Sequence, residues 1–225
     1  MSQIQAHRSR RALGKQRRRG RILDAARAIV ATDGVDGLSM RKVARAAAVS
    51  VTTLYNLFGS KEELRRALCG DLLDGIDREL AATPLSRPIE RAEAVIGVGA
   101  AHVVRFADVT RPAILAAAQA PQQPDPAAPR STEMQRVALQ AAMDVGLLRG
   151  DLRAEPLAAQ IYQGFGQAAL GWASGRLDAN GFRDDALYAL YVCLLAVASD
   201  ALRPQLVASI ERLEPRMAGR DPRAA

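Results

Sequence analysis

The stretch Ser50-Val51-Thr52-Thr53-Leu54-Tyr55-Asn56-Leu57-Phe58 decides how this chain folds. Ser50 can cap the N-terminus of a helix, and Gly59 can end that helix after about two turns. Leu54 and Phe58, four positions apart, give the helix an apolar face that can be buried. The other side chains offer methyl groups, hydroxyls and one amide without any charge. Such a surface suits the edges of DNA bases.

A second short helix of the same construction precedes this one. Ser39 can cap a helix from Met40 to Ala46. Leu38 and Val43 are placed to pack together as a hydrophobic staple at its start. Only residues 47–49 separate the two helices, which is the connection length of a helix-turn-helix. In that motif the second helix enters the major groove of DNA.

The stretch from residue 22 to residue 64 resembles the N-terminal domain of tetracycline-repressor-type (TetR family) transcriptional regulators. The residues at the family's spacing are Gly34, Val43-Ala44, Val49-Ser50, Thr53-Leu54-Tyr55, Phe58 and Ser60-Lys61-Glu62-Glu63-Leu64. Two positions depart from the pattern: Ala48 replaces the usual turn glycine, and Leu57 replaces a histidine that often contacts phosphate. A positive φ at Ala48 would cost roughly 1 kcal/mol, which tertiary packing can offset.

The resemblance implies that the helix after Ser50 reads operator DNA. Threonine methyls can meet thymine methyls, and Asn56 can pair with adenine. Arg41, near the start of its helix, can contact phosphate, although a charged helix face is often only solvated. The candidate DNA-binding residues are Ser39, Arg41, Ser50, Val51, Thr52, Thr53, Tyr55, Asn56, Lys61, Arg17, Arg18 and Arg19.

The positive charge of the chain is concentrated at its N-terminus. The net charge is +7, yet residues 1–21 hold eight cations and no acid, which leaves 23 basic against 24 acidic residues elsewhere. A basic leader directly before a helix-turn-helix can bind phosphates or enter a minor groove. The alternative is a disordered tail that only increases solubility.

Length and composition favour an all-α protein with a substantial core. The 225 residues are 49% hydrophobic but only 4% aromatic, and alternating β-branched runs are absent. We expect an N-terminal three-helix helix-turn-helix domain and a C-terminal helical domain for ligand binding and dimerisation. The expected divisions are a flexible basic arm over 1–19, the DNA-binding domain over 20–67, the helical domain over 68–215 and a polar tail over 216–225.

Helical periodicity and caps predict the remaining elements. Ser60 and Glu63 form a capping box that opens a helix reaching about Ala82. The four prolines of the segment from Gln119 to Arg130 exclude regular structure there, and Thr132 with Gln135 forms another capping box. One further helix is expected to begin near Ile22. The remaining expected helices cover residues 88–106, 108–118, 131–146, 155–174, 182–202 and 204–213.

The helix over 182–202 contains an apolar run, Ala186 to Ala198, that must be covered on every side. A partner subunit can cover one of its faces, and the resemblance likewise implies a homodimer formed by the last two core helices. The resemblance also implies a small-molecule effector between the helices of the C-terminal domain. The candidate ligand-binding residues are His102, Arg105, Phe106, Tyr162, Phe165 and Trp172, whose aromatic members could equally be plain core.

No catalytic or metal-binding constellation is apparent. His7 lies in the leader and His102 is the other histidine, while Cys69 and Cys193 lack nearby ligands or partners. We therefore expect no enzyme activity, metal or cofactor. The longest apolar run is too short to span a bilayer, so we expect a cytoplasmic protein. The leading hypothesis is a homodimeric repressor released from a palindromic operator by a small molecule; the alternative is a DNA-binding regulator or architectural protein without such an effector.

Overall fold

The computed structural model describes residues 2–84 and 87–219, with side chains described from residue 13 onward. Across this described part the chain forms α-helices and no β-strand, which confirms the all-α class. The chain divides into two compact units, Met1–Asp71 and Leu72–Ala225. The division falls within helix α4 (Lys61–Ala82), which is continuous as predicted.

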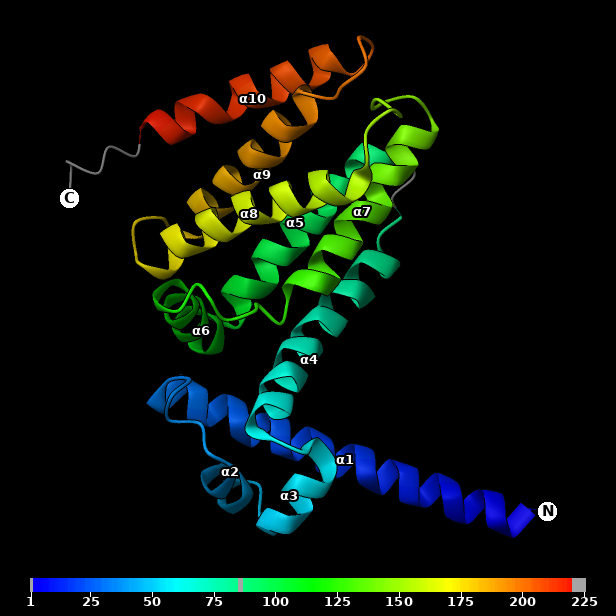
Figure 1. Ribbon diagram of the computed structural model, residues 1–225, viewed down its shortest axis with the longest axis vertical. Coiled ribbons are helices and arrows are strands. Elements are labelled where there is room, and N and C mark those ends of the chain that lie inside the picture. Colours follow the sequence, from blue (N-terminus) through cyan, green and yellow to red (C-terminus); the bar gives the residue numbers. More distant parts are fainter. Residues whose placement is uncertain (1, 85–86, 220–225) are drawn as a thin grey trace. The chain divides into compact units, whose positions relative to one another are not determined.

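The first unit contains α1 (Ser2–Asp33), α2 (Met40–Ala46) and α3 (Val51–Phe58), followed by the start of α4 (Figure 1). Both predicted caps form, because the Ser39 hydroxyl accepts a hydrogen bond from the Lys42 amide at 3.3 Å and Ser50 accepts one from Thr53 at 3.0 Å. Leu54 and Phe58 face the interior. The bounds of α2 and α3 are those that the sequence predicts.

Helix α1 is longer than the sequence predicts. It begins at Ser2, whereas an arm without regular structure was expected over residues 1–19. Arginine, alanine, leucine and glutamine are good helix formers, and no proline occurs before Asp33. The helix can therefore continue through the basic leader.

The turn between α2 and α3 adopts a left-handed conformation at Ala48, where φ is 51°. Ala48 is the one non-glycine residue in the described part of the chain with a positive φ. Its neighbour Val49 donates a hydrogen bond to the carbonyl of Ala44 at 3.0 Å, which closes the turn. The departure from the family's turn glycine is thus accommodated without a change of backbone.

The second unit is built from the end of α4 and six further helices (Figure 1). These are α5 (Pro88–Arg105), α6 (Ala107–Gln119), α7 (Ala128–Asp144), α8 (Ala154–Ala173), α9 (Ala179–Leu195) and α10 (Arg203–Ala218). Helix α9 packs against α5, α8 and α10, and α7 packs against α5 and α8. One apolar core runs through these helices.

Several boundaries in this unit differ from the prediction, and three of them are informative. Helix α7 begins at Ala128, and the Thr132 hydroxyl donates to the Ala128 carbonyl at 2.6 Å, so the expected cap from Thr132 does not form. Helix α9 ends at Leu195 because the next residues pair with the segment after α7, through hydrogen bonds from Arg149 to Val197 and from Ser199 to Leu147. Helix α10 continues to residue 218, into the expected polar tail.

The apolar run of α9 is covered largely by the chain itself. Leu190 and Leu194 have no exposed surface, and the helices that cover them are α5, α8 and α10 of the same protomer. Val192 is the large apolar side chain of α9 that stays exposed, at 45%. The need to cover this run therefore does not by itself require a second subunit.

Candidate nucleic-acid interface

Helix α3 presents a polar, uncharged face to solvent. Val51, Thr52, Tyr55 and Asn56 are exposed, whereas Leu54 on the opposite face is fully buried. No described residue hydrogen-bonds to the side chains of Thr52, Tyr55 or Asn56. These groups are free to bind base edges or phosphates.

Ser50 and Thr53 form a coupled pair at the start of α3. Their hydroxyl oxygens lie 2.7 Å apart, in addition to the cap bond from the Thr53 amide to Ser50. One hydroxyl must donate to the other, so the rotamer of Thr53 is fixed by the cap. The two hydroxyls therefore bind each other in this structure, and the methyl group of Thr53 is the part of that side chain left to contact a base.

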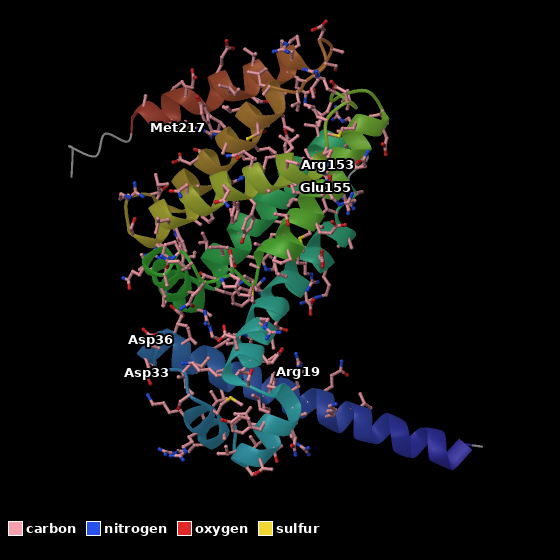
Figure 2. The ribbon with its side chains drawn as sticks, viewed as in Figure 1. Arg19, Asp33, Asp36, Arg153, Glu155 and Met217 are labelled. Atoms are coloured by element: carbon pink, nitrogen blue, oxygen red, sulfur yellow. The ribbon has the colours of Figure 1, made fainter. Side chains whose placement is uncertain are left out.

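The cations of α2 and α4 divide into paired and unpaired groups. Lys42 binds Asp33, at the end of α1, at 3.0 Å (Figure 2), and its hydrogen bond lowers the pKa of that carboxyl. Arg41, Arg45 and Lys61 are exposed and have no ion-pair partner among the described residues. Arg45 was not among the predicted contacts, and the sequence did not distinguish it from the paired Lys42, because neither has an acidic residue three or four positions away.

The basic leader has a contact with the recognition helix. The Arg19 guanidinium lies 4.7 Å from the centre of the Phe58 ring, and Figure 2 shows Arg19 on α1. Such a cation–π contact holds α1 beside the C-terminal end of α3. Arg17 and Arg18 are exposed and remain candidates for phosphate contacts.

Helix α1 is also joined to the first part of α4. Arg27 forms ion pairs with Asp24 on its own helix and with Asp71 on α4. Ile22, Ala26 and Val30 of α1 are buried beneath the motif. The reading face of α3 is thus supported by a packed base rather than by α2 alone.

The six predicted ligand-binding residues fall into separate groups in the second unit. Phe165 and Trp172 both pack on Phe182, with ring centres 5.2 and 5.9 Å away, and belong to the core or its edge. Tyr162 donates a hydrogen bond to Asp125 at 2.5 Å, which ties the proline-rich connection to α8. The structure does not gather all six residues around one cavity.

The histidine group lies between α4 and α5. His102 is buried, and its Nε2 lies 2.9 Å from a carboxylate oxygen of Glu79. The other edge of its ring lies against Gly75, where a Cβ atom would come within 2.8 Å of Cε1. Phe106 is 6.2 Å from the His102 ring, and the exposed Arg105 lies over Phe106 at 5.7 Å. His102 is therefore a packing contact of α4 as well as a ligand candidate.

A second link to α4 comes from the start of α7. Arg130 forms ion pairs with Asp74, at 2.6 Å, and with Asp77. These two carboxylates raise the pKa of the guanidinium, Asp77 most strongly. The part of α4 that belongs to the second unit is thus bound to α5 through His102 and to α7 through Arg130.

A cavity of about 410 Å³ lies at the N-terminal part of α9, lined by Asn180, Arg183, Asp184, Leu187 and Arg216. It includes none of the predicted ligand-binding residues. In the described residues no group of three metal-ligating side chains occurs, and Cys193 is a free thiol. Burial raises the pKa of the Cys193 thiol, which disfavours its reactive thiolate. None of the described helices meets the length and hydropathy of a membrane span.

Comparison with known proteins agrees with this architecture. Residues 22–68 match the family model described as bacterial regulatory proteins, tetR family. The HTH-type transcriptional repressor KstR of Rhodococcus jostii is 35% identical over 82 residues, which cover 36% of this chain and 39% of KstR. The chain thus matches about two fifths of the length of that relative.

Solved structures share the fold over most of the chain. RolR in complex with resorcinol matches with a TM-score of 0.60 at 19% identity, over 88% of this chain and 96% of RolR. FadR of Thermus thermophilus, in complex with lauroyl-CoA, matches with a TM-score of 0.57 at 23% identity, over 78% of this chain and 93% of FadR. These features define a helix-turn-helix protein with a helical C-terminal unit. Residues 22–68 match the tetR-family model, and the fold of the chain is similar to that of solved TetR-family regulators.

Proposed function

We propose that the protein is a homodimeric repressor that binds a palindromic operator and is released from it by a small molecule. The observation that carries this proposal is the exposed, uncharged face of α3, supported by a capped α2 and a left-handed turn at Ala48. KstR, which is 35% identical over 82 residues, is named as a transcriptional repressor.

Two copies of α3 would occupy successive major grooves about 34 Å apart. In each copy Thr52, Thr53 and Asn56 would meet base edges, while Tyr55 would contact phosphate. Val51 and the caps Ser39 and Ser50 would lie at the edges of the interface. The unpaired cations Arg41, Lys61 and Arg45 complete it, since phosphate contacts fix the orientation of a DNA-binding protein.

The basic leader would add phosphate contacts outside the motif. Arg17 and Arg18 are exposed on α1, next to the Arg19 contact with α3. Each neutralised phosphate changes the slope of log affinity against log salt by about −0.9. Deletion of residues 1–18 should therefore make that slope shallower by several units. Parallel salt lines for the full-length and truncated proteins would show instead that the leader only aids solubility.

The dimer would form through the outer faces of α8 and α9. Val192 is exposed there on α9, and a Cβ atom at Gly166 of α8 would meet no other atom within 4 Å. Val192→Arg would place a charge in the interface without disturbing the protomer core, and should yield folded monomers in sedimentation at micromolar concentration. Gln140→Arg, on the exposed side of α7, is the control that should stay dimeric.

The effector would bind in the second unit, as the ligands named with RolR and FadR bind proteins of this fold. His102, Arg105, Phe106, Tyr162, Phe165 and Trp172 remain its candidate contacts. A ligand releases the operator only if it binds the released state more tightly, by a few kcal/mol.

The experiment is a DNA footprint of the full-length protein on its own upstream region, repeated with a metabolite library. A palindromic footprint that one library compound removes, while raising the melting temperature, supports the whole proposal. A footprint that no compound changes favours the regulator without a small-molecule effector. Absence of any sequence-specific footprint contradicts the proposed function.

A further inference from the structure

Gln135 on α7 is a buried side chain whose amide has no hydrogen-bonding partner. The residue is 2% exposed, and neither Nε2 nor Oε1 lies within reach of a polar group of the described chain. Burying an amide without such bonds is unfavourable by several kcal/mol in apolar surroundings. Each such group in a folded protein requires an explanation, and a bound molecule is one of the few available.

Four other buried polar residues of the second unit each form a side-chain hydrogen bond, although His102 Nδ1 and the Oγ of the half-buried Ser199 are also unpaired. Thr110 donates to the Val103 carbonyl at 2.7 Å, and Ser209 accepts from Arg212 at 2.9 Å. Asp184 accepts from Arg216 at 2.9 Å, and His102 contacts Glu79 through Nε2. Among the buried polar residues of this unit, Gln135 is therefore the one in which every polar side-chain atom is unpaired.

Both polar atoms of the amide are buried within the unit. Gln135 shares a helix face with Ala138, Leu139 and Ala142, all of them in the core. This face of α7 packs against α5 and α8, which also carry the histidine and the aromatic residues predicted to bind ligand. Two of these three neighbours are alanines, whose small side chains leave the amide partly uncovered on its own helix.

Helix α6 packs against α5 and α8, the same two helices that the Gln135 face of α7 packs against. Thr110 is its one buried residue, and Leu115 is 37% exposed. A helix with few buried contacts opens at low free energy. Movement of α6 would loosen its contacts with α5 and α8, which also cover Gln135, and a pocket that forms there in a minor state can be filled by a ligand that prefers it.

The chemistry of the surroundings restricts the ligand. A glutamine amide presents a donor and an acceptor side by side, so its complement carries an acceptor next to a donor. The one buried charged residue of the unit is Asp184, which is already paired, and no described cation is buried to neutralise an anion. The rest of the surface at α5, α7 and α8 is apolar.

We propose that Gln135 recognises the effector, and that the effector is an uncharged, mainly apolar molecule with an adjacent hydrogen-bond donor and acceptor, as in a cyclic secondary amide. This inference rests on the proposed function only in calling the ligand an effector. The binding site itself is independent of what the protein does on DNA.

The test uses four probes of one size on the full-length protein. The probe 2-quinolone has the donor and acceptor, N-methyl-2-quinolone lacks the donor, naphthalene lacks both, and quinoline-2-carboxylate is charged. Binding is measured by calorimetry for the wild type, for Gln135→Met and for the control Gln140→Met. Gln140 lies on the exposed side of the same helix, bonded to Asp144.

We expect 2-quinolone to bind the wild type and the Gln140→Met protein at least about tenfold more tightly than the other probes, since one or two hydrogen bonds decide the difference. Gln135→Met should lose this preference. Its melting temperature without ligand should be unchanged or up to about 4 °C higher, because an unpaired amide is removed.

Equal binding of the four probes, binding of none, or a preference retained by Gln135→Met overturns the proposal. So does a fall of the melting temperature by more than about 4 °C in Gln135→Met, which would mean that the amide is bonded within the fold. Operator binding without probe is measured for all three proteins. If the wild type binds no operator, the proposed function fails while the probe result still decides the role of Gln135.

Discussion

Helices α3 and α9 are stabilised in opposite ways. Helix α3 has eight residues, of which Leu54 and Phe58 are buried, and its stability depends on the Ser50 cap and on Gly59 at its end. Helix α9 has seventeen residues and is covered by α5, α8 and α10. A helix that must stay exposed to read DNA takes its stability from its ends, whereas a core helix takes it from its sides.

The largest expected effect separates buried from exposed positions within α9. Leu194 has no exposed surface, so Leu194→Arg should destabilise the protein by about 4 kcal/mol through an unpaired buried charge. Urea denaturation followed by circular dichroism measures this change. Val192→Arg is the matched control: it leaves the protomer core intact, so it should lose much less stability than Leu194→Arg even though it weakens the proposed dimer contact. Equal stability of the two variants would mean that α9 is not covered as described.

The next effect concerns the approach of α5 to α4. A Cβ atom at Gly75 would collide with the His102 ring, so Gly75→Ala should cost about 1–2 kcal/mol even though alanine favours helices. At Gly70, on the same helix, a Cβ atom meets nothing within 4 Å. Gly70→Ala should therefore stabilise the protein by about 0.5–1 kcal/mol. Opposite shifts in denaturation midpoint support the packing, and shifts of the same sign argue against it.

The sequence predicted α3 well because its signals are local. Ser50, Leu54 and Gly59 lie within ten residues of one another, and each has one evident role. The second unit could not be predicted at the same level, because its roles depend on distant partners. Residues 196–202 leave the helix to pair with residues 147–149, and Phe182 joins Phe165 to Trp172 across two helices.

The same limit applies to the candidate sites. Arg41 and Lys61 could be distinguished from Lys42 only when Asp33 was found beside Lys42. Gln135 fits a capping box with Thr132 in the sequence, so the sequence did not indicate that its amide is buried and unpaired. A long basic α1 replaced the expected arm, because the sequence shows helix propensity there but no boundary.

A smaller effect tests the caps of the DNA-binding motif. Ser50→Ala removes a cap bond of 3.0 Å and the partner of the Thr53 hydroxyl, and should cost about 1 kcal/mol. Ser39→Ala removes a longer bond of 3.3 Å and should cost less. Hydrogen exchange of the amides of residues 51–54 follows the change locally. A larger loss from Ser39→Ala would contradict the assigned importance of the Ser50 cap.

The smallest effect is at the turn. Ala48 adopts a left-handed backbone, which costs an alanine about 1–2 kcal/mol, while glycine loses more entropy on folding. Ala48→Gly should therefore stabilise the motif by a net value of about 0.5 kcal/mol, visible as a higher denaturation midpoint. A lower midpoint would mean that the turn conformation differs in solution.

The most direct test of the central claim is selection of binding sites from a random DNA pool by the wild type, Asn56→Ala and Tyr55→Phe. We predict a palindromic consensus for the wild type with half-sites about 34 Å apart. The consensus should change with Asn56→Ala, which loses a base contact, while Tyr55→Phe should keep it and bind every site more weakly. A wild-type pool without a palindrome, or an unchanged consensus for Asn56→Ala together with a changed one for Tyr55→Phe, would contradict the account.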